Sequence, residues 1–357
     1  MNKLLFITNS FGMGGAEKLL IDIIKILKND YIVEVLTFKD GGQLKSETHE
    51  VANVYTIFRN KFHYFIFRKI KLYRKFKINK FIKENNYDFV VGFMEGKSTD
   101  LVSDIDISVK KIAWIHNDFR KQDVYSKNSE VIKTYSNMDK IVCVSYEARS
   151  AFFEKYKSVK LDSEVIHNLI NEERIFEQSS LLNIQNSVFT FLNVAMLRKQ
   201  KRQDRLVMAA ATLKEKQYKF QIQIIGDGPQ RSYLESLIHD LDVSDCVSLL
   251  GMKENPYPYI KACDCFVLSS DYEGYSIVVK EALFLKKLVL TTNVVGPSEI
   301  LENGNFGLIV NNSTEALIAK MMDIIEKNGK YPAIQINIEQ HGFDQKAIVE
   351  KLKLLFN

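Results

Sequence analysis

The stretch Cys265-Phe-Val-Leu-Ser-Ser270 leads into Glu273-Gly-Tyr-Ser-Ile-Val-Val-Lys-Glu281. The first part is an apolar run of strand length, and the second begins at a glycine turn and then has the character of a helix. Two carboxylates eight residues apart on a helix lie about 80° apart around its axis, on roughly one side. The stretch therefore predicts a strand, a turn and a helix. One carboxylate, Glu273, is expected at the N-terminus of the helix, and the other, Glu281, two helical turns further along. Such a pair suits one elongated ligand that is rich in hydroxyl groups.

The alternation of apolar runs and helical patterns continues along both halves of the chain. Strands are predicted at residues 4–8, 32–38, 89–94, 111–115 and 140–144, and then at 188–194, 220–225, 247–249, 265–268, 288–291 and 307–310. Strands that are apolar throughout and are separated by helices indicate parallel sheets covered on both faces. We therefore predict an α/β protein with two doubly wound, Rossmann-like domains.

The length of 357 residues also favours two domains. A polar and weakly periodic segment, residues 171–186, is predicted to be the linker between them. The predicted boundaries are 1–170 for the N-terminal domain and 171–340 for the C-terminal domain. Residues 341–357 contain an amphipathic helix that we expect to pack back across the domain junction.

Composition narrows the class of protein. Hydrophobic residues make up 46% of the chain and charged residues 26%, as in an ordinary soluble globular protein, and the net charge of +5 does not by itself indicate nucleic acid. Four cysteines lie in or beside apolar runs and form neither a disulfide framework nor a zinc motif, which fits a reducing, cytoplasmic compartment. The N-terminal apolar run is too short for a signal peptide, and no run of 18 apolar residues predicts a membrane-spanning helix.

Three strand-to-helix turns could bind an anion. Gly12-Met-Gly-Gly-Ala-Glu17 follows the first predicted strand, and Gly226-Asp-Gly-Pro229 follows a strand of the second half. Glycine lets a backbone approach a ligand closely, and a helix N-terminus supplies N–H groups and partial positive charge. The third turn, Glu273-Gly-Tyr-Ser276, offers backbone N–H groups in the same way. Read singly, each turn is also compatible with an ordinary tight connection.

Taken in order, these motifs resemble the retaining glycosyltransferases of family four, which have the GT-B architecture with a cleft between the domains. The resemblance runs along the whole chain. It includes Gly12–Glu17, Val165-Ile-His-Asn-Leu-Ile-Asn171, Ile224–Pro229, Leu249-Leu-Gly251, the Glu273–Glu281 signature, Gly296-Pro-Ser-Glu299 and Asn303–Ile309.

The resemblance implies roles for particular residues. Glu281 would accept hydrogen bonds from the donor's ribose, and Glu273 would hold the transferred sugar. The backbone of Gly274, Tyr275 and Ser276, with Gly14 and Gly15, would receive the diphosphate. Leu250, Gly251 and Met252 would border the base, and Gly226 and Ile277 would also contact the donor. His116, in Trp114-Ile-His-Asn-Asp118, matches a polar residue near the reacting sugar. Lys201 and Arg198 would be the cations.

The chain departs from the family pattern at two places. Met196, in Ala195-Met-Leu197, stands where the family usually has an arginine facing the diphosphate, and Arg198 would compensate. Lys286 stands where a glycine is usual after the signature helix, and we expect this to affect only the helix end.

The resemblance implies retention at the anomeric carbon, no metal ion and no resident cofactor, with a UDP-linked hexose or N-acetylhexosamine as co-substrate. The acceptor would be a lipid-linked, lipopolysaccharide or capsule oligosaccharide.

A basic and aromatic segment, Arg59 to Lys83, contains ten Lys or Arg and no acidic residue. Read as a helix, it would suit contact with anionic headgroups, which would hold the protein at the inner face of the cytoplasmic membrane. A core-facing helix with a solvated basic face explains the aromatic residues at least as well. No recognised motif accompanies the segment that would indicate nucleic-acid binding.

Other functions remain open at this point. Asp104-x-Asp106 could belong to a metal-dependent transferase, but no further ligands accompany it. A dinucleotide oxidoreductase is disfavoured because Gly12–Glu17 lacks the Gly-x-Gly-x-x-Gly spacing. A non-catalytic GT-B partner subunit, or a protein that only binds nucleotide sugars, is kept open by Met196.

Overall fold

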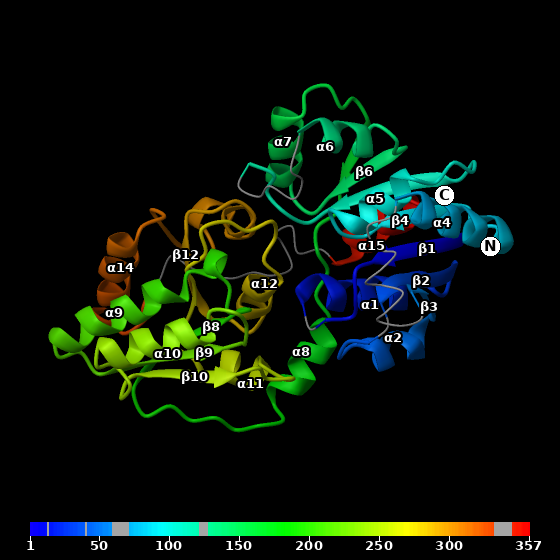
Figure 1. Cartoon of the computed structure of the whole chain (residues 1–357). Helices are drawn as coiled ribbons and strands as arrows, with labels where there is room; N and C mark the ends of the chain where they lie inside the picture. Colours follow the sequence, from blue (N-terminus) through cyan, green and yellow to red (C-terminus); the bar gives the residue numbers. More distant parts are fainter. Residues whose placement is uncertain (13, 40, 59–70, 121–127, 332–344) are drawn as a thin grey trace. The chain divides into compact units, whose positions relative to one another are not determined.

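The computed structural model describes residues 1–12, 14–39, 41–58, 71–120, 128–331 and 345–357, and forms two compact units (Figure 1). Unit 1 comprises Met1–Leu169 and Gln345–Asn357, and unit 2 comprises Ile170–Asp344. Each unit is built on one parallel sheet, as the fully apolar strands predict.

Unit 1 contains a seven-stranded sheet with the order β3-β2-β1-β4-β5-β6-β7. The strands are β1 Lys3–Thr8, β2 Ile32–Lys39, β3 Asn53–Phe58, β4 Phe89–Gly92, β5 Lys110–Ile115, β6 Lys140–Cys143 and β7 Asp162–Val165. The helices are α1 Gly15–Leu27, α2 Lys45–Val51, α4 Lys71–Asn85, α5 Lys97–Ser103, α6 Asn128–Tyr135, α7 Tyr146–Lys155 and α15 Gln345–Leu354. The order reverses between β1 and β4, which makes that position the switch point of the sheet.

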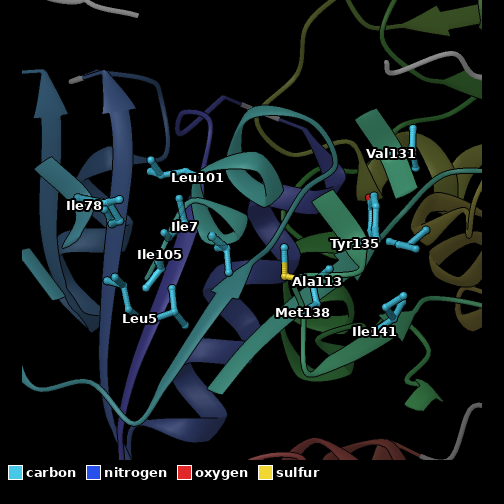
Figure 2. Packing of buried hydrophobic residues seen from close by; sticks show 14 of the residues in the cluster. Leu5, Ile7, Ile78, Leu101, Ile105, Ala113, Val131, Tyr135, Met138 and Ile141 are labelled. Carbon is cyan, nitrogen blue, oxygen red and sulfur yellow. The ribbon is translucent and has the colours of Figure 1, made fainter. Parts of the chain in front are cut away.

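Side chains of unit 1 alternate between the two faces of the sheet. Leu5 and Ile7 of β1 are fully buried in a cluster with Ile78 of α4, Leu101 of α5 and other residues of this face, as Figure 2 shows. Phe6, between them in the sequence, points the other way and meets Phe93 and Phe356 edge to face. Helices therefore cover both faces, so the strands are apolar throughout.

Unit 2 contains a six-stranded sheet with the order β10-β9-β8-β11-β12-β13. The strands are β8 Phe189–Val194, β9 Phe220–Ile225, β10 Val247–Gly251, β11 Cys265–Leu268, β12 Leu288–Thr292 and β13 Leu308–Val310. The helices are α8 Glu172–Ser179, α9 Gln203–Glu215, α10 Arg231–Asp240, α11 Tyr257–Ala262, α12 Ile277–Phe284, α13 Pro297–Ile300 and α14 Thr314–Glu326, with 3-10 turns η1 Lys199–Lys201 and η2 Glu302–Gly304. The order reverses between β8 and β11.

The two faces of the second sheet carry separate cores. Phe191 of β8 belongs to the cluster under α9, α10 and α14, whereas the next residue, Leu192, belongs to the cluster under α8, α11 and α12. The same alternation holds in β11, where Val267 and Leu268 go to opposite faces. This arrangement confirms the predicted doubly wound α/β fold.

The predicted linker at residues 171–186 is wrong in its first half, because residues 172–179 form α8. The Asn171 side chain caps this helix by accepting a hydrogen bond from the backbone N–H of Arg174 at 2.9 Å. Ile175 is fully buried in the core of unit 2, but the helix is otherwise mostly polar. An eight-residue helix that buries a single large apolar side chain gives little periodicity for a prediction to use.

The basic segment Arg59–Lys83 is described only in part, since residues 59–70 lie outside the described residues. Residues 71–83 belong to α4, as the helical prediction requires. Ile78 and Ile82 are buried in the core of unit 1, whereas Leu72 and Phe76 are exposed. The helix is therefore core-facing on one side and exposes both apolar and basic residues on another. Among the helices of the described ranges, none is long and apolar enough to span a bilayer.

The C-terminal helix α15 packs within unit 1. Phe356, just after the helix, is fully buried and meets Phe6, Tyr31 and Phe89 edge to face at centroid distances of 6.1, 5.9 and 5.4 Å. The Tyr31 hydroxyl donates to the Lys353 carbonyl at 2.9 Å. The expectation that the helix also crosses the domain junction stays a prediction.

We predict that Phe356→Ala destabilises unit 1 by about 3–5 kcal/mol, because it removes a buried aromatic side chain and leaves a cavity. Trp114, the single tryptophan of the chain, is buried in unit 1, so its fluorescence during urea unfolding reports this unit. Leu354→Ala is the matched control, since Leu354 is 67% exposed and its loss should change the free energy of unfolding by less than about 0.5 kcal/mol. Equal effects of the two substitutions would contradict the packing role of the C-terminal segment.

Candidate functional site

An ion pair spans the switch point of the second sheet. Lys201 lies at the end of η1, after β8, and Glu273 lies in the turn after β11. The Lys201 Nζ atom is 2.6 Å from Oε1 of Glu273 and 2.9 Å from Oε2. Ligands of doubly wound sheets bind outside the carboxyl ends of the strands at such a reversal. The structure thus brings together two residues that the sequence predicts for one site.

Glu273 is held firmly in place. Its side chain is almost fully buried, and the Ser270 hydroxyl donates a second hydrogen bond to Oε1 at 2.6 Å. A buried carboxylate is costly unless it is paired and hydrogen-bonded. Lys201 and Ser270 together meet that requirement and fix the direction of the carboxylate.

The loops that carry the ion pair are also joined to each other. The Gln200 side chain donates to the Tyr272 carbonyl at 2.8 Å, and the Asp271 N–H donates to the Gln200 carbonyl at 2.9 Å. The Ser269 hydroxyl donates to the Lys201 carbonyl at 2.8 Å. These bonds fix the loop after β8 against the loop after β11, so the ion pair has a rigid frame.

Asp271 extends this frame to α9. Its carboxylate lies 3.1 Å from a guanidinium nitrogen of Arg202 and 3.0 Å from one of Arg205. Arg205, which is almost fully buried, also donates to the Ser269 carbonyl at 3.0 Å. The two arginines are thus committed to shaping the loop and are not available as ligand-binding cations.

Arg198 and Met196 lie on the same loop as Lys201, and both are exposed. Burial raises the pKa of the Tyr272 phenol, and the positive charge of Arg198 opposes this rise. Arg198 is therefore near the turn that carries Glu273, although no arginine occupies position 196. Lys201 and Arg198 thus lie on one loop at this edge of the sheet.

Glu281 lies on α12, and the Tyr257 hydroxyl of α11 donates to its Oε1 at 3.0 Å. Between the two glutamates the chain runs through Gly274 and Tyr275 to Ser276, the N-cap residue of α12. The Ser276 side chain makes no capping hydrogen bond. The first-turn N–H groups of α12, beginning at Ile277, therefore have no side-chain cap and are suited to an anion.

Two glycines allow the loops at this edge to approach one another. Gly226 has φ +144°, and a Cβ atom there would lie 1.9 Å from the Ala195 carbonyl oxygen; its N–H donates to the Gly251 carbonyl at 2.9 Å. Gly296 has φ +37°, and a Cβ atom there would lie 2.1 Å from the Gly274 carbonyl oxygen. The loops after β8, β9 and β10 therefore touch, and so do those after β11 and β12. Leu250 and Met252 flank Gly251 at the same edge.

A second group of polar residues lies at the switch point of unit 1. Glu95, after β4, is almost fully buried, and its Oε1 accepts hydrogen bonds from the backbone N–H groups of His116 and Asn117 at 2.5 and 2.8 Å. Oε2 accepts from the Asn117 side chain at 3.0 Å. Gly14 and Gly15 begin α1 after the neighbouring strand β1. Glu95 therefore fixes the loop that carries His116.

The His116 ring packs on Phe93, with centroids 4.8 Å apart, and stacks on Trp114 at 6.4 Å. Burial lowers the pKa of His116, while the charge of Glu95 and a backbone hydrogen bond with Phe93 oppose this. Within the described residues, its Nε2 atom is buried and has no hydrogen-bond partner. His116 is thus a half-buried imidazole that is neutral at neutral pH.

Two residues of these sites, Glu95 and Tyr257, were not predicted. A signal for Glu95 exists in the sequence, since a carboxylate directly before Gly96 follows an apolar strand. Nothing in the sequence pairs Tyr257 with Glu281, because the two residues lie on different helices.

The Asp104-x-Asp106 motif lies at the end of α5, and Asp106 pairs with Lys75 at 2.8 Å. In the part of the chain that the structure describes, no group of three or more His, Cys, Asp or Glu side chains could hold a metal ion.

We predict that Gly296→Ala disturbs the turn at Gly274, because the new methyl group would overlap a backbone carbonyl. The overlap should cost about 1–3 kcal/mol beyond the backbone strain. Gly304→Ala is the matched control, since Gly304 also has a positive φ, +113°, but has open space around it. Hydrogen exchange measured by mass spectrometry should accelerate at residues 273–279 in Gly296→Ala alone. The same rates in both variants would show that Gly296 does not support the turn.

Sequence models of two families match the chain. The model for "Glycosyltransferase Family 4" matches residues 13–174, and the model for "Glycosyl transferases group 1" matches residues 174–341. Together they span both units.

Individual relatives agree with the family models. An uncharacterized glycosyltransferase of Methanocaldococcus jannaschii is 30% identical over 250 residues, which are 64% of this chain and 62% of the relative. A Campylobacter jejuni enzyme is 26% identical over 337 residues, 88% of this chain and 87% of its own length. Its name is N-acetylgalactosamine-N,N'-diacetylbacillosaminyl-diphospho-undecaprenol 4-alpha-N-acetylgalactosaminyltransferase.

Solved structures share the fold. The structure of Anabaena Alr3699/HepE in complex with UDP-glucose matches with a TM-score of 0.80 and 20% identity, over 99% of each chain. The chain therefore belongs to the family-four, group 1 glycosyltransferases and has their GT-B fold of two Rossmann-like domains.

Proposed function

We propose that the protein is a retaining, metal-independent transferase that moves a hexose or N-acetylhexosamine from a UDP-sugar to a lipid-linked, lipopolysaccharide or capsule oligosaccharide. The observation that carries this proposal is the Lys201–Glu273 ion pair at the switch point of unit 2, with Glu281 one turn into the helix α12 that follows Glu273. The nucleotide is supported by a structural neighbour whose complex contains UDP-glucose. The acceptor is supported by the C. jejuni relative, whose name includes a diphospho-undecaprenol oligosaccharide.

In this proposal the donor lies along the carboxyl edge of the second sheet. Glu281 accepts hydrogen bonds from the ribose hydroxyls, and Glu273 accepts one from the transferred sugar. Leu250, Gly251 and Met252 border the base. Charged acceptors suit both sugars, because hydrogen bonds to charged groups contribute about 1.5–3 kcal/mol each.

The diphosphate would be received by the first turn of α12 and by Lys201. A lysine ammonium has three N–H donors. Two of them serve the oxygens of Glu273, so the third can serve a phosphate oxygen without breaking the ion pair. Arg198, which is exposed on the same loop, would supply a second cation in place of the arginine that Met196 replaces.

Catalysis in this proposal is mainly positioning and charge stabilisation. The departing diphosphate carries the developing negative charge, and preorganised donors stabilise that charge without reorganisation. The same diphosphate would help to deprotonate the acceptor hydroxyl on the face that it leaves, which gives retention. The roles of Gly14, Gly15 and His116, which belong to unit 1, stay predictions. His116 would act as a neutral hydrogen-bonding group, because burial lowers its pKa.

We predict different kinetic losses for the two glutamates. Glu281→Ala should raise the Kd for the donor about tenfold or more, because the charged ribose acceptor is lost. Glu273→Gln should leave the donor Kd within about threefold and lower kcat about 100-fold, because the sugar is no longer held in the reactive position. Binding is measured calorimetrically, and turnover by release of the nucleoside diphosphate in the presence of EDTA.

Asp240→Ala, which removes an exposed carboxylate on α10, is the control and should behave as wild type. Wild-type constants in both glutamate variants would contradict the donor site. Loss of wild-type turnover in EDTA would contradict metal independence alone.

The exposed side of α4 supports contact with an anionic membrane surface. Lys77, Lys80 and Lys83 are exposed there, beside the exposed apolar residues Leu72 and Phe76. Basic residues near an anionic bilayer contribute about 1 kcal/mol each, and exposed apolar side chains can enter the headgroup region. An acceptor carried on a lipid would then be presented close to the protein.

We predict that replacing Lys77, Lys80 and Lys83 by glutamate weakens binding to vesicles of phosphatidylglycerol and phosphatidylcholine at least about tenfold. Co-sedimentation measures the bound fraction, and vesicles of phosphatidylcholine alone give the non-electrostatic background. The matched control replaces Lys133, Lys157 and Lys160, which are also exposed in unit 1 and change the net charge equally. Equal weakening in the two triple variants would show that only the net charge of the protein matters. No weakening in the α4 variant would exclude α4 as the contact with the membrane.

A non-catalytic role is the second candidate, because Met196 stands where the family pattern has an arginine. Release of nucleoside diphosphate from the donor distinguishes the two. A protein that binds the donor but releases no nucleotide, with or without acceptor, would be a binding subunit.

A further inference from the structure

Glu281 has a neighbour that no family motif includes. Tyr257 is the first residue of α11, and its hydroxyl donates a hydrogen bond to Oε1 of Glu281 at 3.0 Å. The tyrosine is only 3% exposed, so water does not compete for this hydrogen bond. The bond therefore joins a neutral donor to the carboxylate that would accept hydrogen bonds from the ribose hydroxyls.

The Tyr257 side chain is fixed from several directions. Its ring is part of the buried cluster that contains Ile175 of α8 and Ile260 of α11. Its backbone N–H donates to the Asn255 side chain at 3.1 Å, and the Asn255 amide group in turn donates to the Gln178 carbonyl at the end of α8 at 2.9 Å. The phenol is therefore a preorganised donor and not a mobile side chain that happens to reach Glu281.

Burial and the nearby Glu281 carboxylate keep the phenol protonated. Burial raises the pKa of Tyr257 well above its usual range, and the negative charge of Glu281 raises it further, while Arg174 opposes both. The hydroxyl group therefore keeps its proton throughout the pH range in which the protein would be assayed. It can donate to Glu281 at any such pH.

The last torsion of a glutamate side chain is broad and roughly two-fold, so an unsupported carboxylate can rotate. A hydrogen bond from a fixed donor to one oxygen selects one orientation of the carboxylate plane. A vicinal diol presents two hydroxyl groups in a fixed relation, and a carboxylate binds both well only in a matching orientation. The Tyr257 hydrogen bond should therefore increase the affinity only for ligands that have ribose hydroxyls.

We propose that Tyr257 is a positioning residue that orients the Glu281 carboxylate and thereby sets the preference of the site for a ribose with free 2′- and 3′-hydroxyls. This inference rests on the proposed function, because it takes Glu281 as the ribose acceptor. It goes further by naming a residue that acts through Glu281 and by specifying which part of the ligand its loss affects.

The test compares UDP with 2′,3′-dideoxy-UDP by calorimetry. Wild-type protein should bind UDP about tenfold or more tightly than the dideoxy compound, since the latter lacks both hydroxyls. Tyr257→Phe should reduce this preference about three- to tenfold and leave the affinity for dideoxy-UDP unchanged. Tyr259→Phe is the matched control, because it removes a phenol hydroxyl from the same helix and should keep the wild-type ratio.

A double-mutant cycle tests whether the effect of Tyr257→Phe on the preference for UDP requires Glu281. If Tyr257 acts through Glu281, adding Tyr257→Phe to Glu281→Ala should not lower the preference for UDP any further. A purely structural tyrosine would instead weaken binding of both nucleotides by the same factor, in either background. Should Tyr257→Phe fail to fold, 4-chlorophenylalanine at this position fills the space of the hydroxyl without donating, and the same loss of preference is expected.

The outcomes separate this inference from the proposed function. An unchanged preference in Tyr257→Phe, or an equal loss of affinity for both nucleotides, overturns the positioning role while the donor site stands. If wild-type protein binds neither UDP nor the dideoxy compound, or if Glu281→Ala does not change the ratio, the assignment of Glu281 itself fails, and the inference fails with it.

Discussion

The ion pair between Lys201 and Glu273 is the interaction on which the arrangement of unit 2 at its switch point depends. It joins the loops that follow β8 and β11, the two strands between which the strand order of the sheet reverses. Burying the Glu273 carboxylate without a partner would cost free energy, and Lys201 and Ser270 supply its partners. Further hydrogen bonds of Gln200 and Ser269 hold the two loops against each other. The result is a charged group held rigidly at the position where doubly wound sheets bind their ligands.

Each unit has a buried, hydrogen-bonded carboxylate at the switch point of its sheet, although the partners of the carboxylate differ. In unit 1 the buried carboxylate of Glu95 accepts two backbone N–H groups at the end of β5, and so fixes the loop that carries His116. In unit 2 the carboxylate of Glu273 is held by an ammonium and a hydroxyl group. Both carboxylates follow a strand next to the reversal of strand order, so parallel-sheet topology decides where the polar residues gather in each unit.

The sequence predicts most of the sheet strands and the residues at their carboxyl ends, because buried parallel strands are apolar throughout and are easily recognised. It misses β3 and β7, which lie at the edges of the first sheet and carry polar residues such as Asn53 and Glu164. It also misses α8, whose only large buried apolar side chain is Ile175. Tyr257 could not be predicted, since its partnership with Glu281 depends on how two helices pack. After the end of α12, Lys286 has a left-handed φ of +57°, which a glycine would adopt without strain.

A thermal-shift panel of nucleotide sugars tests the central claim most directly, because it requires neither an acceptor nor a membrane. A ligand that binds the folded protein and is present at 100 times its Kd stabilises it by about 2.7 kcal/mol. The account predicts such a shift for a UDP-sugar in wild-type protein and a much smaller shift in Glu281→Ala. The absence of a shift with every nucleotide sugar, or the same shift in both proteins, would contradict a nucleotide-sugar site on this edge of the second sheet.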